Sequence, residues 1–531
     1  MIGKIAVSAA VFAIDKPYSY RIPADMTLLP GHRVQIPFGR GNKMAEGIVL
    51  SVETGDEAKL KAVARLLDDE PMLTPHQLRL ASFLRERYFC TFYDAVRAML
   101  PAGAWFHTKV SFSLTGDESW RTAAIRKEGA LAVLRLLESL GGQAEEQTLH
   151  AAVAQEDTFA AALEYLLRKK WIATQQEFRP RVTDKTEKVA TLAVPSEQAR
   201  EFAASRPASA ALQRGVLELL ASLGSGAVKA LGYVTLSQRP VLRCREIVPT
   251  PISGELVLNR EQQQAFQGLQ TQMEAQEPGV ALLYGVTGSG KTSVYIRLIQ
   301  RCLESGKSAL LLVPEIALTP QLLGLMAAWF GSQVAVLHSS LGMGERYDQW
   351  KRVKAGEARV IVGTRSAVFA PSESLGLIIL DEEQEHSYNS ENSPRYAARE
   401  VAIWRGAKEH TLVLLGSATP SVESMYHAKN GTYSLYTLRS RFNGRPLPQV
   451  EIVDMREEVR LGNDLSLSDS LRQELYDNWN SGSQTVLLLN RRGNSRALVC
   501  VDCREVPQCP RCSLAMTYHS ANGRLMCHYC G

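Results

Sequence analysis

The sequence predicts a multidomain α/β protein whose largest domain is a parallel β-sheet covered by helices on both faces. The chain has 531 residues, too many for one hydrophobic core, and the usual domain size implies about three to five domains. Apolar runs without period-two alternation recur within 258–440, as expected for strands buried on both faces, at 280–283, 308–313, 334–337, 359–362, 375–380 and 411–415. Helix-like segments separate these runs, at 321–330, 345–354 and 397–408. The ligand site of such a sheet is expected at the carboxyl ends of its strands.

A glycine-rich loop follows the first of these runs and precedes a helix-like segment at 293–304. The loop consists of Gly285, Val286, Thr287, Gly288, Ser289, Gly290, Lys291 and Thr292. Its glycines let backbone N–H groups face a phosphate, and the dipole of the next helix adds positive potential. Lys291 is expected to reach the β- and γ-phosphates, and Thr292 to ligate Mg²⁺. A loop that merely turns the chain is the alternative, but the full pattern favours a nucleoside triphosphate site.

An acidic segment follows the apolar run at 375–380 and consists of Asp381, Glu382, Glu383 and Gln384. An aspartate at the end of a buried strand can hold Mg²⁺ through water, and Glu382 can orient or deprotonate the attacking water. Acidic residues at a strand end are usually a solvated turn. Because this segment follows a phosphate-binding loop in the same predicted sheet, we favour the catalytic interpretation.

Composition restricts the compartment more than the function. The net charge of +5 neither requires nor excludes nucleic acid, and no apolar run is long enough to span a bilayer. The apolar segment 5–14 after Lys4 resembles a secretory signal, but its β-branched residues and the following turn favour a strand. Six of the nine cysteines form C-x-x-C pairs near the C-terminus, which beside an ATP site indicates reduced thiols. We therefore expect a cytoplasmic protein.

Two regions precede the predicted sheet. Residues 1–105 show short alternating runs separated by glycine and proline, which predict a small β-rich module. Its basic turn at 37–43 could contact a nucleic-acid backbone, although an ordinary hairpin turn has the same composition. Residues 115–250 contain three helix-like segments, at 130–140, 146–154 and 158–169, followed by strand-like residues, an order typical of a winged helix. Winged helices bind DNA or protein, so this region adds little about function.

Three cysteine pairs near the C-terminus have the spacing of structural zinc sites: Cys500 with Cys503, Cys509 with Cys512, and Cys527 with Cys530. Two thiolates at this spacing can face one tetrahedral ion. Redox pairs are the alternative, and three pairs favour zinc. Six thiolates cannot fill two sites of four ligands.

Six motifs stand in the order found in superfamily 2 helicases, at 285–292, 312–319, 363–369, 381–384, 416–420 and 489–493. The amino-acid sequences of these motifs, together with the cysteine pairs that follow, closely resemble the family of primosomal replication-restart helicases. The resemblance extends to the N-terminal segments 18–20, 37–39 and 60–61, so it covers the whole chain.

This resemblance implies an ATP-dependent DNA helicase that moves 3′ to 5′, recognises stalled or repaired replication forks and starts primosome assembly. The implied architecture is a β-rich 3′ DNA-end-binding domain (1–105), a winged-helix region (115–250), a RecA-like ATP-binding helicase lobe (251–440), the start of a second lobe (441–496) with a helix at 468–479 and a strand at 485–490, and an inserted zinc-binding module (497–531). Implied ligands are ATP, Mg²⁺ and two zinc ions. Implied partners are forked DNA with a nascent 3′ end, single-stranded DNA, single-strand binding protein, and primosome and helicase-loader proteins, with no membrane partner.

The resemblance also implies roles for single residues. Gln262 would read the adenine edge, while Lys291, Asp381 and Glu382 would perform hydrolysis. Other matched positions couple hydrolysis to DNA movement (Ser417, Thr419 and the aromatic-rich loop 387–396) or form the DNA-end pocket (Tyr18, Gly39 and Lys61). Cys509, Cys512, Cys527 and Cys530 would form one complete zinc site, and Cys500 and Cys503 would need a further pair beyond Gly531.

The chain departs from the family pattern at two positions. Gln384 stands where the family commonly has histidine, so coupling between ATP and DNA is expected to be tuned differently. Ser19 replaces a common acidic residue, which would weaken discrimination of a free 3′ hydroxyl. Because the chain stops inside its zinc module, we expect these 531 residues to bind ATP and DNA but to hydrolyse ATP poorly. Two alternatives stay open: another superfamily 2 DNA translocase of the branch-migration or restriction type, and a non-catalytic fork-binding scaffold.

Overall fold

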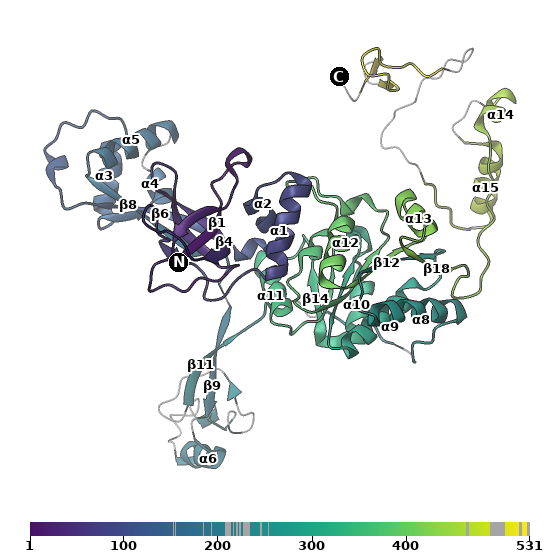
Figure 1. Ribbon diagram of the computed structural model, residues 1–531, viewed down its shortest axis with the longest axis horizontal. Coiled ribbons are helices and arrows are strands. Elements are labelled where there is room, and N and C mark those ends of the chain that lie inside the picture. The colour runs from purple at the N-terminus through teal and green to yellow at the C-terminus, as the bar shows by residue number, and fades with distance from the viewer. Residues whose placement is uncertain are drawn as a thin grey trace. The chain divides into compact units, whose positions relative to one another are not determined.

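A computed structural model of the chain contains two compact units, Met1–Pro446 and Leu447–Gly531 (Figure 1). The structure describes residues 1–151, 153, 156–183, 185–192, 194–205, 207, 214–215, 217–218, 221, 225–226, 234–244, 247–252, 254–463, 467–488, 505–519 and 523–527. Among these residues, no helix has both the length and the apolar character that crossing a bilayer requires.

The first unit contains the predicted parallel sheet. Its strands are β12 (Gly279–Gly285), β13 (Ser308–Leu312), β14 (Val334–Leu337), β15 (Val360–Gly363), β16 (Leu375–Asp381), β17 (Leu412–Ser417) and β18 (Ser434–Leu438). They lie in the order β14-β15-β13-β16-β17-β12-β18, and every neighbouring pair is parallel. The predicted strands therefore form, with ends shifted by one or two residues. The sequence did not indicate β18, because an edge strand is only partly buried and has no continuous apolar run.

Helices cover both faces of this sheet. They are α8 (Arg260–Glu274), α9 (Lys291–Glu304), α10 (Pro320–Phe330), α11 (Met343–Lys354), α12 (Ala398–Glu409) and α13 (Val422–Lys429). Consecutive residues of one strand enter different hydrophobic cores: Leu310 lies in one core and Leu311 in the other. Because neighbouring side chains of a strand point to opposite faces, both faces of the sheet are buried, as its continuous apolar runs predicted.

The N-terminal module is an antiparallel sheet of β1 (Ile2–Val7), β2 (Tyr18–Arg21), β3 (Arg33–Phe38), β4 (Lys43–Glu53) and β5 (Arg65–Leu66), in the order β2-β1-β4-β3-β5. Two helices follow, α1 (Pro75–Tyr88) and α2 (Phe92–Met99). The side chain of Thr74 accepts from the N–H of Gln77, and the Gln77 side chain bonds back to the Thr74 N–H, so a capping box starts α1.

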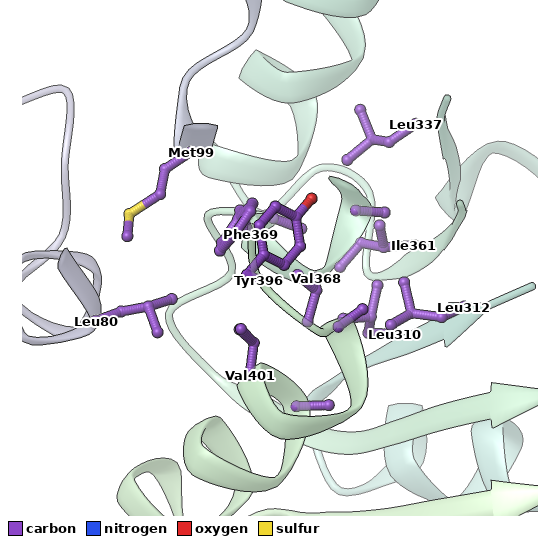
Figure 2. Close-up of a cluster of buried hydrophobic side chains, with 14 of the residues drawn as sticks. Leu80, Met99, Leu310, Leu312, Leu337, Ile361, Val368, Phe369, Tyr396 and Val401 are labelled. Atoms are coloured by element: carbon purple, nitrogen blue, oxygen red, sulfur yellow. The ribbon is translucent and has the colours of Figure 1, made fainter. Parts of the chain in front are cut away.

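These two helices share a hydrophobic core with the parallel sheet. Leu80 of α1 and Met99 of α2 belong to the same hydrophobic core as Phe369, Tyr396 and Val401 (Figure 2). The N-terminal module, predicted to be β-rich, therefore also contains the helices α1 and α2, and these pack against the parallel sheet through apolar contacts.

The region predicted as a winged helix contains the predicted helices α3 (Ala130–Ser139), α4 (Glu146–His150) and α5 (Glu156–Arg168) around one core. A sheet with the order β7-β6-β8 packs beside them, made of β6 (Phe106–Leu114), β7 (Gln143–Glu145) and β8 (Ile172–Pro180). A second small sheet has the order β10-β9-β11, from β10 (Ser225–Gly226), β9 (Thr186–Leu192) and β11 (Val234–Pro240), with α6 (Ser196–Ser205) after β9.

The second unit contains α14 (Met455–Arg460), α15 (Asp469–Asn480) and a hairpin of β19 (Thr517–His519) and β20 (Arg524–Met526). The helix predicted at 468–479 forms, with Ser468 as its N-cap. The strand predicted at 485–490 is wrong for 485–488, which have no regular structure, and 489–490 lie outside the described residues. Val486 is 92% exposed because no neighbouring strand in the described part of the unit supplies backbone hydrogen bonds or covers it.

Candidate functional site

The predicted phosphate-binding loop connects β12 to α9 at the carboxyl edge of the parallel sheet. Gly288 and Gly290 have φ of 77° and 78°, a left-handed conformation that favours glycine. The first N–H groups of α9 have no carbonyl partner within the helix and are therefore suited to bind an anion. The Lys291 ammonium donates to the carbonyl of Gly285 at 3.1 Å, so the lysine folds back across the loop.

Gln262, the predicted adenine-reading residue, is fully buried beneath this loop. Its side-chain nitrogen donates to the carbonyl of Ser289 at 2.8 Å, and its oxygen accepts from the N–H of Asn259 at 2.9 Å. The amide thus joins the start of α8 to the phosphate-binding loop. Contact between Gln262 and adenine stays a prediction. To bind adenine, the Gln262 amide would have to share one of these two hydrogen bonds with the base or give it up.

Asp381 ends β16 and lies beside α9. The buried hydroxyl of Tyr295 donates to Asp381 Oδ1 at 2.9 Å. Burial raises the pKa of Asp381 above its usual range, and the nearby charge of Glu382 acts in the same direction. Thr292 and Asp381 would hold Mg²⁺, which prefers hydroxyl and carboxylate oxygens, and the bound ion would neutralise phosphate charge.

Glu382 lies next to the lysine of the loop. Glu382 Oε1 is 3.9 Å from the Lys291 ammonium, which places the predicted water-orienting carboxylate beside the predicted phosphate-binding cation. Glu382 has φ of 48°, a conformation that is uncommon for a residue with a side chain and recurs at functional sites. The water-orienting role of Glu382 stays a prediction that this proximity to Lys291 supports.

A short chain of hydrogen bonds connects Glu382 to the end of β17. The Gln384 side chain donates to Glu382 Oε2 at 3.0 Å and accepts from the Ser417 hydroxyl at 2.6 Å. The Ser417 oxygen also accepts from the N–H of Thr419 at 2.9 Å. The structure therefore brings the acidic segment and the predicted coupling element into direct contact.

Glu383 has a structural environment that its sequence position did not indicate. Its side chain is completely buried, forms a 2.7 Å ion pair with Arg399 of α12, and accepts from the N–H of Ser421 at 2.7 Å. The carboxylate consequently fastens the acidic segment to the starts of α12 and α13. No pattern in the sequence could separate its role from that of Glu382, since only long-range contacts distinguish them.

The aromatic-rich loop contributes buried side chains to this site. Tyr388 and Tyr396 are 3% and 5% exposed. The Tyr388 hydroxyl lies 2.7 Å from the backbone carbonyl of Asp381 and 3.0 Å from that of Leu312. Arg365 donates to the carbonyls of Ser387 and Asn389. The loop is thus held to the sheet edge by its tyrosines, a contact that its predicted coupling role requires.

The three residues predicted for the DNA-end pocket gather at one end of the N-terminal sheet. The Tyr18 ring packs edge-on against Phe38, with ring centroids 5.1 Å apart. Gly39 follows Phe38 with φ of 70°, and its carbonyl accepts from the Lys61 ammonium at 2.7 Å. No heavy atom lies within 4 Å of the position of an added Gly39 Cβ, so the turn is open to a ligand.

Three predicted zinc ligands lie together in the second unit. The sulfur atoms of Cys509, Cys512 and Cys527 are within 4.8 Å of one another, and Cys509 and Cys527 are buried. Three converging thiols fit zinc, which takes cysteine ligands in tetrahedral sites. Cys530, the predicted fourth ligand, and the pair Cys500 and Cys503 lie outside the described residues.

These features define the class of protein. A parallel sheet with a phosphate-binding loop after β12, an acidic segment after β16 and a Ser-Ala-Thr segment after β17 is the ATP-binding lobe of a superfamily 2 helicase. Three family models match: a 3′ DNA-binding domain at residues 4–101, a DEAD/DEAH box helicase at 259–427, and the Cys-rich region of the PriA DNA helicase at 509–531.

The chain belongs to the replication restart protein PriA family. It is 36% identical to the replication restart protein PriA of Bacillus subtilis over 561 aligned positions, covering 100% of this chain and 67% of the relative. Its identity to that of a Synechocystis species is 34%, covering 98% of this chain and 66% of the relative. The chain therefore spans about two thirds of the length of these relatives. A structure of RecG bound to a three-way DNA junction is 23% identical, covering 40% of this chain and 29% of that one, at a TM-score of 0.28, too low to support an argument.

Tyr295 contacts the candidate site through Asp381, and the sequence analysis did not single it out. It lies within the helix that follows the phosphate-binding loop, where a tyrosine would ordinarily be a core residue. Its contact with Asp381 of β16 depends on a close approach of α9 to the neighbouring strand β17, where an added Cβ on Gly416 would lie 1.8 Å from the Tyr295 hydroxyl. A buried tyrosine needs a partner for its hydroxyl, and that general requirement was the available signal.

Proposed function

We propose that the chain is the DNA-end-binding and ATP-binding part of an ATP-dependent 3′-to-5′ DNA helicase that recognises stalled or repaired replication forks and initiates replication restart. The observation that carries this proposal is the unbroken contact from Lys291 through Glu382 and Gln384 to Ser417. An ATP site that was vestigial would have no reason to keep its phosphate-binding and coupling elements in contact. This argues for the helicase over a non-catalytic scaffold.

In the proposed mechanism the loop between β12 and α9 binds the triphosphate through backbone N–H groups and Lys291. Glu382 accepts a proton from, or orients, the attacking water, while Asp381 and Thr292 hold Mg²⁺. Loss of the γ-phosphate would remove the negative charge beside Lys291 and change its attraction to Glu382. The hydrogen bonds of Gln384 would pass that change to Ser417 and the segment after it.

The finer ligands and partners belong to this proposal. They are forked and single-stranded DNA, Mg²⁺, two zinc ions, single-strand binding protein, and primosome and helicase-loader proteins. The Tyr18, Gly39 and Lys61 pocket would receive a nascent 3′ end, with the ring stacking on a base and the ammonium facing phosphate. Reduced thiols in the zinc module are in keeping with action in the cytoplasm.

Lys291→Ala tests the proposal. The variant should lose nucleotide binding and DNA-stimulated hydrolysis while retaining fork binding, because the DNA-end pocket lies in a different domain. Lys429→Ala, at the exposed end of α13, removes the same charge and should change neither. If Lys291→Ala retains both fork binding and normal nucleotide affinity, the result would contradict the proposed ATP site. A branch-migration translocase would bind forks with and without a nascent 3′ end equally well.

A further inference from the structure

A cavity of about 340 Å³ is lined by three arginines from different parts of the first unit. They are Arg97 of α2, Arg181 just after β8, and Arg346 of α11. We call this cavity the arginine pocket. Its size is that of a small-ligand or nucleotide subsite.

Arginines outnumber carboxylates in the lining of the arginine pocket. Within the described residues, neither Arg97 nor Arg181 has a carboxylate within 4.0 Å. Glu46 is the one carboxylate in the lining, and it lies 3.8 Å from Arg33, a buried arginine outside the lining. Burial raises the pKa of Glu46, while the nearby charge of Arg33 acts in the opposite direction.

The guanidinium group of Arg346 is only partly satisfied by hydrogen bonds within the arginine pocket. It donates one bond of 2.6 Å to the carbonyl of Ser339, and its Nε is buried without an acceptor. Burial lowers the pKa of Arg346. An anion in the pocket would supply the acceptor that the buried Arg346 Nε lacks.

The pocket lies between the two regions already expected to meet DNA. Glu46 is on β4, about 10 Å along the strand from Lys43 in the turn that carries Gly39. On the other side, Arg346 also lines a small neighbouring cavity with His338 and Ser366, which follow β14 and β15. The pocket therefore joins the DNA-end module to the carboxyl edge of the helicase sheet.

We propose that the arginine pocket binds the phosphate backbone of a DNA strand that runs between the DNA-end pocket and the carboxyl edge of the parallel sheet. Planar guanidinium groups match phosphate geometry and stay charged at any physiological pH. Contacts to phosphate oxygens carry no sequence information, so this contact would be independent of sequence. This inference rests on the proposed function, since it assumes that the chain binds DNA.

The test compares Arg97→Gln/Arg181→Gln with wild type in binding a fluorescent single-stranded oligonucleotide over a range of salt concentrations. The 3′ end is blocked with phosphate to keep the DNA-end pocket from dominating. The double variant should bind about tenfold or more weakly, and its salt slope should fall by about 0.7 for each arginine removed. Arg301→Gln/Arg472→Gln removes equal charge from exposed arginines paired within their own helices, and it should leave affinity and slope unchanged.

Three outcomes would overturn the inference. In the first outcome, the pocket variant (Arg97→Gln/Arg181→Gln) binds DNA with the same affinity and salt slope as wild type. This result would leave the proposed function intact. In the second outcome, inorganic pyrophosphate raises the melting temperature of wild type but not of the pocket variant, while the pocket variant binds DNA as well as wild type does. The pocket would then be a site for a free anion only. The third is an equal loss in the control variant, which would assign the effect to net charge. Absence of DNA binding by wild type would instead contradict the proposed function itself.

Discussion

The hydroxyl of Ser417 donates a 2.6 Å hydrogen bond to the side-chain oxygen of Gln384. Gln384 stands where the resemblance to the helicase family implies histidine, and it uses both ends of its amide, because its nitrogen donates to Glu382. A glutamine can make these two bonds at once and does not titrate near neutral pH. The substitution therefore keeps the bridge between the acidic segment and the end of β17 while removing a proton-dependent group.

Gln384→Ala should break this bridge without disturbing the ATP loop. We expect nucleotide affinity in the absence of DNA to stay within about twofold of wild type. The change in nucleotide affinity caused by forked DNA should fall by about fivefold or more, the size of a typical coupling between sites. Titration of a fluorescent nucleotide with and without DNA measures both. An unchanged DNA effect in the variant would show that coupling bypasses Gln384.

Tyr295→Phe should weaken the hold on the carboxylate that is expected to bind Mg²⁺. The variant removes the 2.9 Å bond to Asp381 and leaves a buried acceptor, at a cost of about 1–3 kcal/mol in stability. Nucleotide affinity should fall in the presence of Mg²⁺ and stay the same in its absence, because the tyrosine acts on the metal-holding residue. Calorimetric titrations with and without Mg²⁺ provide the readout.

Tyr436→Phe is the matched control for this prediction. Tyr436 is on β18, away from the acidic segment. The variant removes the 3.1 Å hydrogen bond that its hydroxyl accepts from Gln272 of α8. A loss of affinity that is equal with and without Mg²⁺, in either variant, would point to general destabilisation of the lobe rather than to positioning of Asp381.

The sequence predicted the parallel sheet and the ATP loop because both depend on local pattern. Continuous apolar runs and the loop from Gly285 to Thr292 specify their own conformation, and the strand ends then place Asp381 near Lys291. The contacts of Glu383 with Arg399, of Tyr295 with Asp381, and of α1 with α12 could not be predicted. They depend on how elements far apart in the chain approach one another, for which a single sequence carries no periodic signal.

The contact between α1 and α12 is expected to be held by apolar stacking more than by charge. Phe83 and Trp404 stack with ring centroids 5.0 Å apart and planes 21° apart. Trp404→Ala should lower the free energy of unfolding by about 2–3 kcal/mol, because it leaves a cavity in a shared core. Arg87→Ala, which removes an exposed ion pair with Glu400, should leave the urea midpoint nearly unchanged. Urea unfolding that shows the reverse ranking would contradict this assignment.

Removal of zinc should affect the second unit alone. Cys509, Cys512 and Cys527 converge beside the β19–β20 hairpin, which has only three residues in each strand and too little apolar area to fold unaided. A chelator should therefore release zinc, measurable with a colorimetric indicator, and remove hydrogen-exchange protection from 505–519 and 523–527. Protection of the parallel sheet and nucleotide affinity should not change, because the first unit has its own cores. Cys527→Ser should reproduce the effect of the chelator, whereas Cys90→Ser, at a buried cysteine of the first unit, should retain the metal. Hairpin protection that survives complete loss of zinc would show that the three thiols are not structural ligands.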